Sequence, residues 1–127
     1  MTQAKRAERP LSPHIQIYRI QVTSVSSILT RITGNALIFG VLLAVWWLLA
    51  AATSDQYFAT ADRVATSWFG DLVFTGSAWA VWYHYLAGLR HLYFDAGRGL
   101  DIATAERLGW GCIIGSVLLT ILTILIV

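Results

Sequence analysis

Three long stretches of this chain are almost free of ionisable side chains, and they constrain its fold more than any other feature. Residues 32–54 and 108–127 contain no charged residue, and residues 72–89 contain only His84. A helix needs about 20 apolar residues to cross a bilayer, with a range of roughly 17–25. In lipid a segment must satisfy its own backbone hydrogen bonds, so segments of this length are helices. The sequence therefore predicts three transmembrane helices.

Buried helices of a soluble bundle are the alternative explanation for the same stretches. Such helices carry polar residues at helical period, whereas residues 41–51 and 113–127 are apolar all round. Charged residues make up 13% of the chain, about half of the roughly 25% found in an average soluble domain. The single cysteine, Cys112, excludes an internal disulfide and a cysteine-based zinc or iron–sulfur site. These features favour an all-α membrane protein over a soluble enzyme.

The chain divides into a short N-terminal segment and a membrane domain. We expect residues 1–23 to lie at the cytoplasmic surface, because Pro10 and Pro13 preclude a regular helix there. Residues 24–127 are expected to form the transmembrane domain, with helices at about 24–53, 67–94 and 108–127.

The distribution of basic residues predicts the orientation in the membrane. Most basic residues would lie on one side of the membrane. They are Lys5, Arg6, Arg9 and Arg19 before the first helix and Arg90, Arg98 and Arg107 near the end of the second helix and in the loop after it. The loop between the first two spans contains only Arg63. Because cytoplasmic loops carry the excess of Lys and Arg, we expect a cytoplasmic N-terminus. Trp46, Trp47 and Trp68 then fit an aromatic belt at the opposite interface.

His84 is the ionisable residue deepest within a predicted span. Such groups are costly in a membrane and mark functional sites. Gly88 follows one helical turn later on the same face and removes side-chain bulk beside the imidazole, as a flat macrocycle would require. At this point the residues leave three roles open: a haem ligand, a structural histidine between helices, or a proton relay. Asp71, near the other end of this span, is expected to be a solvated interfacial residue.

A haem bound by His84 would need its second axial ligand from another chain. His91 lies seven residues further along the same helix, about 10.5 Å along its axis. Two axial nitrogens on one iron are only about 4 Å apart, given metal–nitrogen distances of about 2.0 Å. His14 lies in the surface segment. The chain has no C-x-x-C-H motif, so the haem would be non-covalent and b-type.

Ser27 and Arg31 lie one turn apart near the start of the first span and project from one face. A lone arginine here could extend to the lipid headgroups. The pair, however, offers a hydroxyl beside a charged donor, which suits a quinone carbonyl or a haem propionate.

Three motifs resemble one known family. Residues 9–18 (RPLSPHIQIY), 27–34 (SILTRITG) and 84–95 (HYLAGLRHLYFD) are similar, in order and spacing, to the cytochrome b membrane-anchor subunits of succinate dehydrogenase. The resemblance covers nearly the whole chain, including the number of helices. It implies a bacterial inner-membrane location and a role in succinate:quinone oxidoreduction.

The resemblance also implies roles for individual residues. His84, which opens the H-x-x-x-G-x-R-H-L motif, corresponds to the axial ligand of haem b, with the opposite ligand supplied by a second anchor subunit. Ser27 and Arg31, in the S-x-x-x-R-x-x-G motif, correspond to residues of the ubiquinone site, and Arg31 also lies near a haem propionate in that family. Thr30 departs from the pattern, because the family usually has histidine there, and this puts a further propionate contact in doubt.

The partners follow from the same resemblance. They are the second anchor subunit, an iron–sulfur subunit, a flavoprotein subunit that oxidises succinate, and membrane lipid, with no nucleic acid. Arg90, His91 and Asp95 are expected to form an ion-paired cap that contacts partner subunits. The polypeptide alone is expected to catalyse nothing. The alternatives are a non-redox three-helix assembly or transport subunit, in which His84 packs helices or relays protons, and a fumarate reductase anchor of similar build.

Overall fold

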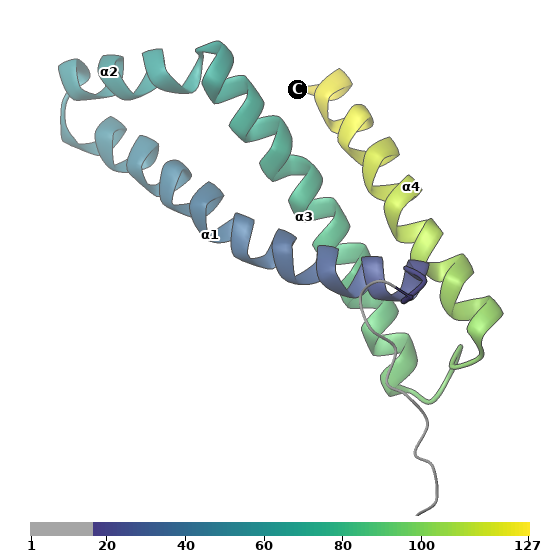
Figure 1. The fold of residues 1–127 in the computed structure, drawn as a ribbon. Helices are drawn as coiled ribbons and strands as arrows, with labels where there is room; N and C mark the ends of the chain where they lie inside the picture. The colour runs from purple at the N-terminus through teal and green to yellow at the C-terminus, as the bar shows by residue number, and fades with distance from the viewer. Residues whose placement is uncertain (1–16) are drawn as a thin grey trace, which may run out of the picture.

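A computed structural model describes residues 17–127, so the earlier part of the expected surface segment, including His14 and both prolines, lies outside the described residues. All regular elements of the described part are helices (Figure 1). Its elements are α1 (Val22–Thr53), α2 (Asp55–Ala65), α3 (Trp68–Asp95) and α4 (Ile102–Ile126).

Two of these helices are long and apolar enough to cross a membrane. They are α1, with 32 residues and a mean hydropathy of 2.3 in its most apolar stretch, and α4, with 25 residues and a value of 2.2. Only 6% and 22% of these stretches are buried, so most of their apolar side chains are exposed. α3 has 28 residues, and its Trp, Tyr and His residues lower its hydropathy below that of the other two. The exposed apolar faces are those of a membrane protein.

Short polar side chains mark where three helices begin. Ser54 accepts a hydrogen bond from the Tyr57 amide at the start of α2, and Ser67 accepts one from Gly70 at the start of α3. Asp101 accepts one from the Thr104 amide before α4. Each side chain satisfies a backbone donor that has no partner inside the helix.

α4 begins at Ile102, earlier than the start near residue 108 that the charge-free stretch suggests. The difference has a simple cause. The charge-free stretch starts only after Glu106 and Arg107, but both residues lie within the helix that Asp101 caps. Absence of charge reports where the chain is apolar, whereas capping determines where the helix starts.

α2 was not anticipated from the sequence, and it joins the ends of α1 and α3 that lie furthest from the α1 N-terminus (Figure 1). Trp46 Nε1 donates a hydrogen bond of 2.9 Å to the Tyr57 hydroxyl. Trp47 Nε1 donates one of 3.4 Å to Asp62. The two indoles on α1 therefore hold α2 across that end of the molecule.

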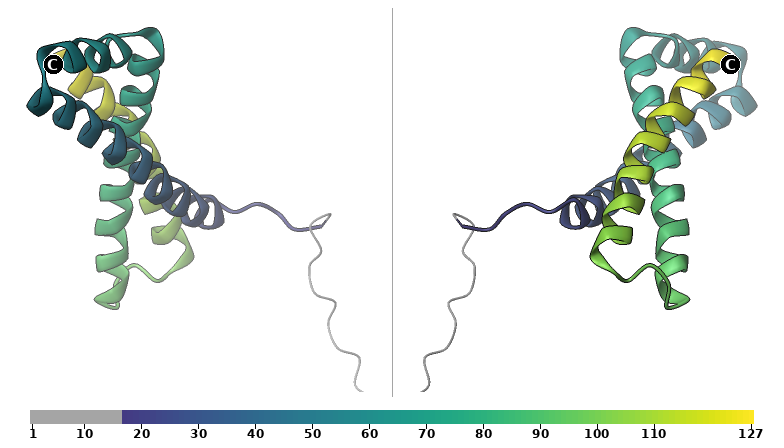
Figure 2. Two further views of the ribbon diagram at one scale, coloured as in Figure 1. Left: turned by 90° about the vertical axis from the view of Figure 1, so that its left-hand side faces the viewer. Right: turned by 90° about the vertical axis from the view of Figure 1, so that its right-hand side faces the viewer.

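α3 packs against both α1 and α4, while α1 crosses this pair and then diverges from α3 towards α2 (Figure 2). The C-terminal end of α4 lies at the same end as α2 (Figures 1 and 2). The residues packed in the core are Tyr83, Ala87 and Cys112, with Leu29, Trp79, Leu86 and Ile113 around them. The small side chains of Ala87 and Cys112 let the helix backbones approach closely here, as is usual between membrane helices.

Candidate functional site

His84 lies on α3 with its imidazole directed at the backbone of α1. Its Nδ1 is 3.1 Å from the carbonyl oxygen of Thr30 and 3.4 Å from the hydroxyl oxygen of Thr33. The Thr33 hydroxyl donates its single hydrogen to carbonyls of its own helix, with Leu29 O at 2.8 Å. Both neighbours of Nδ1 are therefore acceptors, so Nδ1 carries a hydrogen and donates it to Thr30. In the neutral ring this leaves Nε2 with a free lone pair.

A glycine on α1 makes this contact possible. A Cβ atom built at Gly34 would lie 3.0 Å from His84 Cε1 and 3.4 Å from Nδ1. The sequence instead pointed to Gly88, where a Cβ would meet nothing within 4 Å beyond the adjacent backbone of its own helix. Gly34 therefore gives the ring its place against α1, while Gly88 leaves open space one turn along α3. The last position of the S-x-x-x-R-x-x-G motif was the available signal for Gly34.

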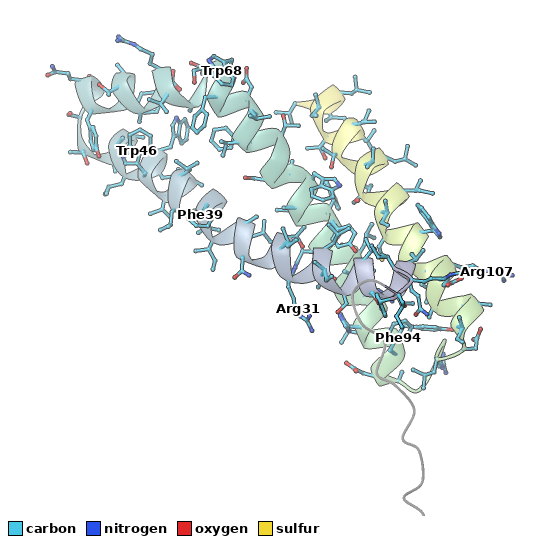
Figure 3. The ribbon with its side chains drawn as sticks, in the orientation of Figure 1. Arg31, Phe39, Trp46, Trp68, Phe94 and Arg107 are labelled. Carbon is cyan, nitrogen blue, oxygen red and sulfur yellow. The ribbon has the colours of Figure 1, made fainter. Side chains whose placement is uncertain are left out.

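Ser27 and Arg31 lie together on the outer side of α1. They line one open depression with Thr23, Ser24 and Ile28. Ser27 is half-buried and Arg31 is exposed, and the Arg31 side chain extends outward from the helix (Figure 3). A neutral hydroxyl and a guanidinium thus border the same space, and both can donate hydrogen bonds to an oxygen of a bound molecule.

One stretch of α1 connects this depression with His84. Thr30, whose carbonyl accepts from His84, immediately precedes Arg31 in the chain. The Thr30 hydroxyl donates to the carbonyl of Ser26 at 2.8 Å, within its own helix. Thr30, where the family resemblance implies a histidine, therefore contributes its backbone, and not its side chain, to the contact with His84.

The expectation that Arg90 belongs to an ion-paired cap is wrong. Arg90 is buried between the helices, where Nη1 donates to the Ser26 hydroxyl oxygen and Cζ lies 4.9 Å from the ring centroid of Phe94. The helical period explains this, because Tyr83, Ala87 and Arg90 recur on the inward face of α3. His91 and Asp95 fall on other faces and are exposed, as Asp71 is in the first turn of α3.

His84 is not part of a cluster of metal-ligating side chains in the described part of the chain. Within residues 17–127 no group of three or more His, Cys, Asp or Glu side chains could hold a metal ion. A single imidazole whose other nitrogen donates to a carbonyl is the arrangement of a metal-ligating histidine. One such ligand suffices where a macrocycle provides the equatorial donors, so these residues fit a haem iron.

Comparison with known proteins agrees with the motifs. Residues 5–123 match the family described as succinate dehydrogenase/fumarate reductase transmembrane subunit. The chain is 52% identical over 126 residues to the succinate dehydrogenase cytochrome b556 subunit of Paracoccus denitrificans, covering 99% of this chain and 97% of that one. It is 41% identical to the same subunit of Rickettsia conorii, covering 96% and 98% of the two chains. It is 35% identical to the cytochrome b560 subunit of Reclinomonas americana, covering 80% and 74%.

Proposed function

The chain belongs to the succinate dehydrogenase/fumarate reductase transmembrane subunit family, and we propose that it anchors a succinate dehydrogenase, binds haem b and helps to form the ubiquinone site. Its homologues in Paracoccus denitrificans and Rickettsia conorii are succinate dehydrogenase cytochrome b556 subunits, so it is a subunit of an oxidoreductase. The resemblance seen in the sequence is thereby confirmed at the level of the family. The site roles below are the proposal.

The observation that carries the proposal is the contact between His84 and Thr30. The imidazole donates through Nδ1 at 3.1 Å, so Nε2 is the nitrogen left to bind iron. A hydrogen bond of this kind fixes the tautomer and the ring plane of a metal ligand and raises its basicity. A second anchor subunit would provide the other residue that holds the haem, so that the bound haem would link the two subunits. When bound, the haem supplies a one-electron redox centre and a rigid link between chains.

Ser27 and Arg31 provide the quinone-binding part of this chain. The Ser27 hydroxyl and the Arg31 guanidinium border one depression, where each can donate to a quinone carbonyl oxygen. As electrons from the iron–sulfur subunit reach the quinone, negative charge develops on these oxygens. Fixed donors that face the oxygens stabilise this charge without reorganising, which is the principal way such a site favours reduction. Arg31 would also donate hydrogen bonds to a haem propionate.

The proposed membrane arrangement has three spans, α1, α3 and α4, with the N-terminus in the cytoplasm of a bacterial cell. α2 and the end of α4 then lie at the opposite face of the inner membrane, where Trp46 and Trp47 contact α2. α3 packs against both α1 and α4 and carries His84 near the middle of its length. Its exposed aromatic residues Trp68, Tyr85 and Tyr93 face partner subunits or the lipid interface. The flavoprotein and iron–sulfur subunits dock on the cytoplasmic side.

Substitution of His84 tests the proposal. In the purified complex, His84→Ala should abolish or strongly shift the reduced b-type α-band, because it removes an axial ligand. His91→Ala, an exposed histidine on the same helix, is the matched control and should leave the band unchanged. An unaltered spectrum in His84→Ala would refute the ligand assignment. It would mean that other residues hold the haem, and that His84 packs helices or relays protons.

A further inference from the structure

Three buried polar side chains meet where α1, α3 and α4 cross. Ser26 and Tyr83 are fully buried and Arg90 is 9% exposed. The Tyr83 hydroxyl lies 3.0 Å from the Ser26 hydroxyl oxygen and 3.1 Å from the Ser26 carbonyl oxygen, and Arg90 Nη1 donates to the same Ser26 hydroxyl. We call these three residues the Ser26 cluster. It joins α1 to α3 by side-chain hydrogen bonds at the level of the candidate site.

α4 encloses the cluster from its other side. A Cβ built at Gly109 would lie 3.9 Å from the Ser26 Cβ and 3.0 Å from Val22 Cγ1. The backbone of α4 therefore lies directly against the first turns of α1. Ser26 cannot turn towards lipid without breaking its bonds to α3 and leaving this contact.

The rotation of α1 about its axis decides which residues reach the site. Successive residues of a helix are about 100° apart around the axis, and residues four apart share a face. With Ser26 directed inward, Thr30 also faces α3, where its carbonyl meets His84. Ser27 and Arg31 are then turned to the outer depression. The inward direction of Ser26 therefore determines both the contact of Thr30 with His84 and the outward direction of Ser27 and Arg31.

Apart from the contact with His84 and the packing of Leu29, α1 has few inward contacts that could hold its rotation. Of its 32 residues only Ser26, Thr33 and Ala50 are buried. Ala50 lies at the far end of the helix, so Ser26 and Thr33 are the buried residues near the site. Hydrogen bonds are directional, whereas contacts between small apolar side chains tolerate rotation.

The cluster also keeps a charge in an unfavourable place. Arg90 Nε is buried and has no hydrogen-bond partner within residues 17–127. Burying a guanidinium with an unsatisfied donor opposes stability, so adding stability does not explain this arrangement. A role in fixing one rotation of α1 against α3 does explain why Arg90 is buried here.

We infer that Ser26, Tyr83 and Arg90 are positioning residues, which fix the rotation of α1 and thereby aim Ser27 and Arg31 at the quinone. This inference rests on the proposed function of Ser27 and Arg31. It assigns no contact with quinone to the cluster itself. Its consequence is that loss of the Ser26 hydroxyl changes quinone binding although this hydroxyl is buried and bonded to other residues.

The test compares Ser26→Ala with Ser116→Ala in the complete membrane complex. Ser116 is also fully buried, but its hydroxyl donates only within its own helix, to Ile113 O at 2.8 Å. Ser26→Ala should raise the apparent KM for a short-chain ubiquinone by roughly tenfold, because a misplacement of 1 Å can cost about a hundredfold and the shift expected here is smaller. The rate of succinate oxidation by an artificial dye, per complex, should stay unchanged. Ser116→Ala should alter neither quantity.

A purely structural role gives a different result. It would reduce the amount of assembled complex, so that quinone and dye activities fall in the same proportion while KM stays constant. That result would overturn the inference. If Ser26→Ala does not assemble, Tyr83→Phe and Arg90→Lys carry the test, since each keeps most of the side-chain volume. Both should raise KM, by less than Ser26→Ala, and an unchanged KM in both would likewise overturn the inference.

Ser27→Ala, measured in parallel, separates the two proposals. If Ser27→Ala raises KM and Ser26→Ala does not, the positioning inference alone is wrong. If neither Ser27→Ala nor Arg31→Ala affects quinone kinetics, the proposed quinone site itself is wrong.

Discussion

Gly34→Ala is the substitution whose effect on His84 can be worked from the structure. The new Cβ would lie 3.0 Å from His84 Cε1, whereas carbon atoms in ordinary contact are about 3.5–4.0 Å apart. The imidazole must therefore retreat from α1 by about 0.5 Å. The bond from Nδ1 to Thr30 O, now 3.1 Å, would approach about 3.6 Å and cease to be a hydrogen bond. Loss of one such bond costs about 1 kcal/mol, which weakens haem retention about fivefold.

The assay measures how fast haem passes from the purified complex to a haem-scavenging apoprotein. The reduced-minus-oxidised α-band of the complex reports the haem that remains. Gly76→Ala is the matched control, because it adds the same methyl group to α3 at a position with no atom of the described chain within 4 Å. Both changes raise helix propensity by a similar amount. The difference in haem retention between the two variants therefore reports the contact with His84. Equal haem retention in the two variants would refute the placement of the ring against Gly34.

Two further results are expected. Ser27→Ala and Arg31→Ala should each lower succinate–ubiquinone activity by about tenfold or more, through lost charge-assisted hydrogen bonds, and preserve dye reduction; equal loss of both activities would argue against a quinone role. Hydrogen bonds from the Thr104 amide and then its hydroxyl hold the pKa of Asp101 below its ordinary value. The cap of α4 is therefore fully present above the ordinary carboxyl pKa of about 3.9 and is lost as pH falls through the lowered value. Amide exchange at Thr104 should accelerate there, and Asp101→Asn should remove this dependence.

The sequence anticipated the apolar helices well, because absence of charge is a local property that solvent imposes. It anticipated helix ends less well where a helix extends beyond the apolar part. The cap of α4 was visible as Asp101 followed by Thr104 at the spacing of a capping bond. α2 was missed because its eleven residues are too few and too polar to register as a membrane span, although Ser54 caps it in the same way.

The position of Arg90 shows what local patterns leave out. Its bond to Ser26 links residues 64 positions apart, and no periodicity within either helix identifies which face of α1 meets α3. The inward face of α3 was available from the spacing of Tyr83, Ala87 and Arg90. A charged residue at a helix end was nevertheless assigned to the surface, because that is where charges are usually stable.

The geometry of α1 also explains how Thr30 can accept the hydrogen bond from His84. In a helix the carbonyl of Thr30 already accepts from the amide of residue 34, but its oxygen has a second lone pair for His84. Helical side chains tilt towards the N-terminus, so a Cβ at residue 34 would lie over this carbonyl. Glycine at position 34 exposes the oxygen to the imidazole. Threonine at position 30 therefore provides the carbonyl acceptor that orients His84, and the contact depends on glycine at position 34.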